Sequence, residues 1–499
     1  MIRDLANLLA LFLTLLLVPG LEAGEALAAG TILEVRLAGA TGSRLSRRGD
    51  AVRATVIAPV FAGGALIIPQ GATVSGAIQN VDRLGYGLKH LTSSIEYRFD
   101  ALRLPGGAAV PMEARVTQVE TARERVDSQG MISGIYPTMN LSSGAVSYVL
   151  PLLCIEPHFG LPFLGVKVMI ARSPDPEIFF PAGTEMLLRL TREAALPNVA
   201  IPRESLAPLS AADRAEIHNM LAKLPRQQTE RGPRRSSDLV NILFLGSRES
   251  IDRAFQGAGW SGAQRHSLLS LYGMYHCMVQ RKGYRMAPMG NLRLNGLTAD
   301  AEYQKSLDTV SKRHHLRLWK QGKQDIWVSA ATEDVDYKFW RMHLTHATDA
   351  LIDNERAKVV NDLALTGCVE SATLIPRESS AAEEPDQSIL TDGRVAALRM
   401  NGCEKPHLAV DARTSGAGGR RRSVQALVAL RNDLIRSNPI SIAFNTAKLI
   451  GNRHGGAVNG SGLVENAESR KNESAQGGIQ AKWIRPSVLD TTNTVLSTR

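Results

Sequence analysis

The residues most able to do chemistry in this chain lie in two short polar segments, 314–319 and 344–356. The first contains two histidines, an arginine and a tryptophan, and the second combines a histidine, several carboxylates and an arginine. A histidine with an ordinary pKa of ~6.5 can donate or accept a proton near neutral pH. Guanidinium groups bind phosphate and carboxylate groups through paired hydrogen bonds. These residue types therefore predict a site for an anionic group beside a proton donor or acceptor.

Strand geometry decides which of these side chains can meet. Successive side chains of a strand point to opposite faces, so His315, Arg317 and Trp319 are predicted to share one face. In the functional interpretation, Arg317 and Arg356 hold an anionic ligand while His315 or His346 is the catalytic acid or base. The predicted ligand-binding residues are Arg317, Trp319, Asp349, Asp353 and Arg356.

Arg356 also has a purely structural interpretation. Asp353 is predicted to cap a helix that runs to Leu365, which places Arg356 in the first helical turn. The positive end of the helix dipole disfavours a cation there unless the cation faces an acid. A salt bridge from Arg356 to Asp349 or Asp334 is therefore the alternative to ligand binding.

No metal and no cofactor is predicted. Metal ligands such as His315, His346 and Asp349 would have to meet in space, because the sequence has no H-x-x-x-H or H-E-x-x-H pair. It also has no G-x-S-x-G motif that would mark a serine nucleophile. Glycine-rich loops that bind phosphate are absent as well.

The length and net charge of the whole chain limit the interpretation of these residues. At 499 residues it is too long for one ordinary core, so several domains are expected. A net charge of +10 suits an anionic partner. The basic residues are scattered and aromatic residues are not interleaved with them, so nucleic acid is not predicted as a partner.

Residues 1–29 are predicted to form a secretory signal peptide. Arg3 precedes an apolar run at residues 8–18, and small residues follow at 26–29. The apolar run is well short of the ~20 residues that a spanning helix needs. An uncleaved anchor is the alternative interpretation. Either way, the predicted location is the periplasm of a bacterium or its membrane.

Residues 30–191 have the pattern of an antiparallel β-barrel or sandwich. Apolar and polar residues alternate at 31–37 and 51–57, and turns rich in glycine and proline separate such segments. The domain resembles the periplasmic β-barrel domain of the TrbI-like component of type IV secretion core complexes. The resemblance is carried by segments that follow in the same order, at residues 30–33, 65–71, 76, 99–107 and 179–190.

An apolar stretch at residues 131–170 interrupts this pattern. Its two runs are separated by Glu156, Pro157 and His158, and neither run is long enough to span a bilayer as a helix. Two interpretations remain open. The stretch is either a set of buried strands with a packed loop, or a hairpin that enters a membrane or a partner.

A helix and a basic linker at 192–237 lead to a predicted α/β or α+β domain at 238–377. Ser210 and Ser247 are predicted helix caps. The expected helices cover residues 248–259, 264–280 and 353–365. The expected strands cover residues 238–246, 315–320, 325–331 and 368–376. Residues 378–499 are predicted to be a low-complexity, mostly disordered tail.

Four segments of this domain resemble the LssY carboxy-terminal domain family. They cover residues 240–248, 314–319, 326–332 and 345–356. Members of that family also occur fused to membrane modules of the DedA type and the phosphatidic-acid-phosphatase type.

Cys154, Cys277, Cys368 and Cys403 follow no metal-ligand spacing, and their pairing stays open.

Three functions are compatible with these patterns. The favoured one is an exported envelope protein for binding or assembly, whose α/β domain holds an anionic ligand and whose partner is an envelope lipid or protein. The second is a hydrolase that acts on a phospholipid or a phosphorylated cell-wall intermediate. The third is a purely structural module whose polar cluster is an internal network.

Overall fold

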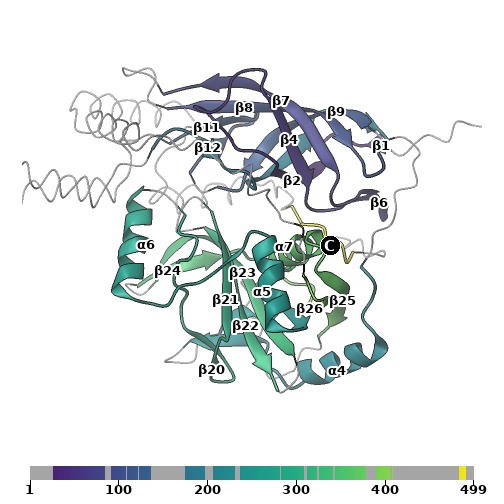
Figure 1. Cartoon of the computed structure of the whole chain (residues 1–499), viewed down its shortest axis with the longest axis vertical. Helices are drawn as coiled ribbons and strands as arrows, with labels where there is room; N and C mark the ends of the chain where they lie inside the picture. Colours follow the sequence, from purple (N-terminus) through teal and green to yellow (C-terminus); the bar gives the residue numbers. More distant parts are fainter. Residues whose placement is uncertain are drawn as a thin grey trace, which may run out of the picture.

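The computed structural model describes a β domain and an α/β domain that contact each other (Figure 1). The described residues are 26–84, 92–107, 109–121, 123–135, 175–196, 206–230, 236–280, 283–307, 312–322, 325–340, 343–377, 389–404, 407 and 483–490. Most of the predicted signal peptide, of the apolar stretch 131–170 and of the predicted tail lies outside these residues.

The first domain is a closed antiparallel barrel, as the alternating sequence predicts. Within the described residues six strands form it, in the spatial order β8-β7-β4-β2-β13-β9, and pairing of β9 with β8 closes the ring. The strands are β2 (Ile32–Leu37), β4 (Ala51–Val56), β7 (Thr73–Asp82), β8 (Ser94–Arg103), β9 (Ala109–Val119) and β13 (Glu185–Leu190).

Short strands pair around this ring. The two-stranded pairs are β1 (Ala26–Leu27) with β14 (Ala194–Ala195), β3 (Thr41–Gly42) with β12 (Phe179–Phe180), and β5 (Val60–Ala62) with β6 (Ala65–Ile68). On the far side of β8, β11 (Met131–Ser133) pairs with β8 and with β10 (Arg125–Val126). The start of the apolar stretch is thus part of the sheet.

Gly76 bends strand β7 where the barrel must curve. The register of the β7–β8 pair shifts between Ser75 and Gly76. A Cβ atom at Gly76 would lie 2.0 Å from the carbonyl oxygen of Arg98, so the strands approach too closely for any side chain. Such a bulge with glycine increases local twist and allows a sheet to close.

The second domain is built on a mixed sheet. Its order is β18-β21-β22-β23-β17-β26-β25, with β24 paired to β23, and β17–β26 is the parallel pair. The strands are β17 (Ile242–Leu245), β18 (Ser261–Gly262), β21 (Ala301–Ser306), β22 (Arg313–Gln321), β23 (Ile326–Trp340), β24 (His343–Thr348), β25 (Val369–Pro376) and β26 (Arg394–Met400). A smaller sheet has the order β16-β15-β19-β20, with β15 (Gln227–Glu230), β16 (Ser236–Leu239), β19 (Leu292–Leu294) and β20 (Leu297–Thr298).

Helices cover both faces of the large sheet. Helix α5 (Arg248–Gly257) and helix α7 (Ile352–Leu365) pack on one face together with Leu316 and Leu318, while α4 (Ala211–Leu221) packs on the other with Trp319. Helix α6 (Leu268–Gln280) lies at the edge of the domain in Figure 1. Ser210 and Ser247 cap α4 and α5 as predicted. Among the described residues, no helix has both the length and the apolar character needed to cross a bilayer.

Two expectations from the sequence were wrong. Helix α7 begins after Leu351, so Asp353 lies within its first turn and is not the cap. The α/β domain does not end at residue 377, because β26 lies inside the sheet between β17 and β25. Residues 483–490 also pack against this domain. The Cys368–Cys403 disulfide joins the residue before β25 to the segment after β26.

Candidate functional site

Strand β22 presents two different polar clusters on its two faces. His315 and Arg317 lie on one face, as the alternation predicts, and His314 lies on the other. All three side chains are almost completely buried. Buried polar groups need hydrogen-bond partners, so the partners of these three residues show what each face of β22 binds.

Arg317 already holds carboxylates of its own domain. Its Nη1 atom donates to Asp238 at 3.0 Å, its Nη2 atom donates to the carbonyl oxygen of Gly290 at 3.0 Å, and its Nε atom lies 3.5 Å from Glu302. With 3% of its side chain exposed, the guanidinium is neutralised inside the domain. Trp319 is farther along the strand and belongs to the apolar core, where its indole donates to the carbonyl oxygen of Leu297 at 3.1 Å.

The two predicted catalytic histidines meet at Asp334. The Nδ1 atoms of His315 and His346 each lie 3.5 Å from the same Asp334 oxygen. Arg313 donates to that oxygen at 2.9 Å. His346 has 31% of its side chain exposed, whereas His315 has 5%. The arrangement offers one accessible imidazole beside a buried carboxylate and a buried imidazole.

Arg356 does not join this group. It lies on α7, where it donates to Asp353 at 2.8 Å and to both carboxylate oxygens of Asp392 at 2.8 Å. Burial opposes ionisation of Asp392, but hydrogen bonds and the charge of Arg356 lower the pKa of Asp392 to about 2. The arginine is therefore salt-bridged, as its structural interpretation predicts, but neither Asp349 nor Asp334 is the partner. Asp392 was missed because it lies beyond the predicted domain boundary.

Asp349 instead lines a cavity of about 360 Å³ between the two domains. The barrel contributes Glu34, Glu120 and Glu185 to this cavity, and the α/β domain contributes Glu333 and Asp349. Two cations, Lys312 and Arg485, share its wall. More acids than cations thus line the interdomain cavity. Its charge is the opposite of what a site for an anionic group, as the sequence predicts, would need.

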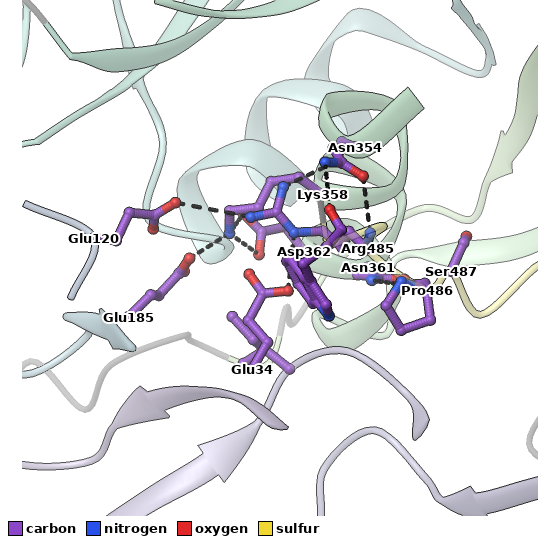
Figure 2. Close-up of polar contacts among 12 residues, drawn as sticks. Glu34, Glu120, Glu185, Asn354, Lys358, Asn361, Asp362, Arg485, Pro486 and Ser487 are labelled. Atoms are coloured by element: carbon purple, nitrogen blue, oxygen red, sulfur yellow. Dashed lines mark hydrogen bonds and ion pairs between the residues drawn. The ribbon is translucent and has the colours of Figure 1, made fainter. Parts of the chain in front are cut away.

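A buried ionic network lies in the interface between the two domains (Figure 2). Arg36 of β2 lies 2.6 Å from both Glu185 of β13 and Asp362 of α7. Lys358 of α7 contacts Glu185 at 2.6 Å and Asp362 at 3.0 Å, and Lys305 contacts both acids as well. Burial works against ionisation of Glu185, yet Lys305, Lys358 and Arg36 hold its pKa well below the usual range.

Helix α7 carries this network on the side opposite its apolar residues. Val359, Val360 and Leu363 pack on the sheet, while Lys358 and Asp362, four positions apart, contact the barrel. Most of the helix is buried between the two domains. The opposite charges of Lys358 and Asp362, four positions apart on one side of the helix, were the available sequence signal for this interface.

Arg485 comes from the part of the chain that was predicted to be tail. Its Nε atom donates to Glu34 of the barrel at 2.9 Å, and its Nη1 atom donates to the carbonyl oxygen of Asn354 at 3.0 Å (Figure 2). Asn354 in turn accepts from the backbone N–H of Arg485 at 2.8 Å. Arg485 therefore connects β2, the first strand of the barrel, to α7.

His314 bridges the two domains. Its Nδ1 atom lies 2.7 Å from Glu355 of α7, and its Nε2 atom lies 2.7 Å from Glu120 of the barrel. Burial alone would lower the pKa of His314, but the charges of Glu355 and Glu120 raise it well above the ordinary value. Glu333 completes the group, because His314, Glu333 and Glu355 each bring one ligand atom within 4.8 Å of the others.

Comparison with known proteins supports the assignment of the second domain. The family model described as LssY C-terminus matches residues 221–395, which span the α/β sheet from the end of α4 into β26. Among solved structures, ComB10 of the Com type IV secretion system of Helicobacter pylori is 15% identical, with 36% of this chain and 94% of that chain covered and a TM-score of 0.21. No curated protein matches the chain. The resemblance predicted from the sequence motifs is confirmed for residues 221–395, which are similar to the LssY C-terminus family.

Proposed function

We propose that this protein is a binding and assembly protein of the bacterial cell envelope that contacts a lipid membrane through helix α6. The observation that carries the proposal is a set of exposed leucines on this helix. Leu268 and Leu269 have 88% and 78% of their surface exposed, and Leu271 is also exposed. We call these three residues the α6 patch. Neighbouring exposed leucines on one helix are typical of an interaction surface.

The surroundings of the α6 patch suit an anionic membrane. Arg265 and Arg285 are exposed, and the backbone N–H of Gln264 donates to the carbonyl oxygen of Met286, which holds these residues beside the start of α6. Burial of a leucine side chain contributes about 1.5–3 kcal/mol. A basic residue near an anionic surface adds about 1 kcal/mol. The sum predicts weak, reversible and salt-sensitive binding.

Two further observations support an envelope location. The Cys368–Cys403 disulfide is typical of proteins in an oxidising compartment such as the periplasm. Residues 1–29 have the signal-peptide pattern. We therefore propose export to the periplasmic side, with an envelope lipid as the first partner.

The anionic group in this proposal is a lipid headgroup at the surface. An anionic ligand inside the α/β domain would have to displace Asp238 from Arg317 or Asp392 from Arg356, and both arginines are nearly buried. Displacing a carboxylate from a buried arginine leaves that carboxylate without its partner, which costs several kcal/mol. A membrane surface requires no such exchange.

The test is co-sedimentation of the full chain with phosphatidylcholine vesicles, with and without phosphatidylglycerol. Leu268→Ser combined with Leu269→Ser should abolish sedimentation with the anionic vesicles. Leu297→Ser is the matched control, because Leu297 is a 64% exposed leucine on β20, away from α6. Equal sedimentation of all three proteins would reject α6 as the membrane contact. Absence of binding by the unaltered chain would reject the membrane and leave a protein partner.

Hydrolysis is a second candidate function, favoured by the meeting of His315 and His346 at Asp334. The half-exposed His346 would be the proton donor or acceptor, and Asp334 would orient it. The test is phosphate release from phosphatidic acid by the purified chain and by His346→Gln. Turnover that the variant lacks would support a hydrolase, whereas no turnover by the unaltered chain would reject it.

A further inference from the structure

We infer that a divalent transition-metal ion binds beside the interdomain cavity, through His314, Glu333 and Glu355. The three residues come from β22, β23 and α7, so an ion at this point would join three elements of the α/β domain. One imidazole and two carboxylates are a ligand set that suits Mn²⁺, Fe²⁺ or Zn²⁺. The inference is independent of the membrane contact proposed above.

The ligand atoms are already gathered. Each of the three residues brings one nitrogen or oxygen within 4.8 Å of the other two. His314 has no exposed surface and Glu355 has 2%, while Glu333 faces the cavity and would give the ion its entry path. Binding would replace the 2.7 Å contact between His314 and Glu355, because two ligand atoms that each lie ~2.0–2.2 Å from an ion are about 3 Å or more apart.

Glu355 supplies independent evidence for a cation site. Its Oε2 atom lies 2.7 Å from His314, but its Oε1 atom has no hydrogen-bond partner among the residues that the structure describes. A buried charged oxygen without a partner costs at least ~1–3 kcal/mol. A bound cation would remove this cost.

Glu120 provides the support that metal-binding histidines require. The ring nitrogen of a metal-binding histidine that does not touch the ion usually donates to a carboxylate. The Nε2 atom of His314 lies 2.7 Å from Glu120, so a proton on Nε2 would be held there and Nδ1 would face the ion. Because Glu120 belongs to the barrel, metal binding and domain docking would support each other.

The described domain interface contains more acidic residues than permanent cations. Its carboxylates are Glu34, Glu120, Glu185, Glu333, Glu355 and Asp362, and its permanent cations are Arg36, Lys305, Lys358 and Arg485. Lys312 and Asp349 also line the cavity and cancel each other. The acidic residues of this interface therefore outnumber its permanent cations by two, and a divalent ion held by His314, Glu333 and Glu355 would add positive charge there.

The test uses the full chain, stripped with a chelator and then titrated separately with Zn²⁺, Mn²⁺ and Ca²⁺ in a calorimeter. Zn²⁺ or Mn²⁺ should bind at one site more tightly than Ca²⁺, which prefers oxygen ligands alone. Glu355→Gln and Glu333→Gln should each weaken binding by about 10-fold or more. The matched control is Glu302→Gln, because Glu302 lies beside Arg317 on the other face of β22.

Three results would overturn the inference. The first is no binding of either transition metal by the unaltered chain. The second is equal binding by the unaltered chain and Glu333→Gln, which would place the ion elsewhere. The third is equal loss in Glu302→Gln. If Glu355→Gln does not fold, as its circular dichroism spectrum would show, Glu333→Gln at the cavity wall still decides the question.

Discussion

Replacing Asp362 by asparagine should strongly destabilise the protein, because this acid is the shared partner of three buried cations. Arg36, Lys358 and Lys305 all contact it, and Glu185 is the other acid within their reach. Lys305, Lys358 and Arg36 hold the pKa of Asp362 well below its usual range although burial opposes this. Asparagine keeps the shape of the side chain but leaves one acid for three cations.

The magnitude follows from burial. Lys358 and Asp362 each have 1% of their side chains exposed. Removal of one partner from a buried ion pair costs about 3–5 kcal/mol, which corresponds to roughly 6–20 °C in melting temperature for a domain of this size. The control is Asp252→Asn, because Arg248 and Asp252 have the same i, i+4 spacing but are about one-third exposed. An exposed pair contributes up to about 1 kcal/mol.

Urea unfolding followed by tryptophan fluorescence measures the change, because the indole of Trp260 donates to Asp362 at 2.9 Å and reports on this place. The double variant Asp362→Asn with Lys358→Met should be more stable than Asp362→Asn alone by about 1 kcal/mol or more, since it removes one unmatched cation. If Asp362→Asn costs no more than Asp252→Asn, the network does not act as a desolvated unit and the reasoning fails.

Two further predictions concern pH and the barrel. The pKa of Asp392 is about 2 in the folded chain and ~3.9 when unfolded, so its pair with Arg356 stabilises the protein above pH ~4. At most about 2 kcal/mol should be lost as the pH falls from ~4 to 2, because solvent screens this partly exposed pair, and Asp392→Asn should show less of this loss in urea unfolding. Gly76→Ala should destabilise the barrel by at least ~2 kcal/mol, while Gly39→Ala, with open space around it, should be nearly neutral in the same assay.

The sequence predicted those parts of the fold that depend on local pattern. Period-two alternation indicated the barrel strands, and Ser247 before an apolar helical face indicated α5. Strand β26 was missed because its apolar run is short and lies between polar segments, and its place in the sheet depends on pairing with β17 and β25. Such pairing between distant segments leaves no local periodicity to recognise.

The same limit applies to the site. Alternation correctly put His315 and Arg317 on one face of β22, because that depends only on strand geometry. The meeting of His315 with His346 depends on β24 pairing with β23, and no short-range pattern specifies this. His314, which the sequence argument left on the opposite face without a role, is the residue that contacts the barrel.

The interface shows why so many charges are buried in this protein. Apolar side chains of equal volume would hold two domains together as well or better, since desolvation offsets much of the attraction in a buried ion pair. An ionic network is more selective, because Arg36 must reach Glu185 in its own domain and Asp362 in the other at once. We infer that the network fixes the orientation of the domains more than it adds stability. That orientation brings Glu120 of the barrel to His314, so a shift between the domains would break the 2.7 Å contact between these two residues.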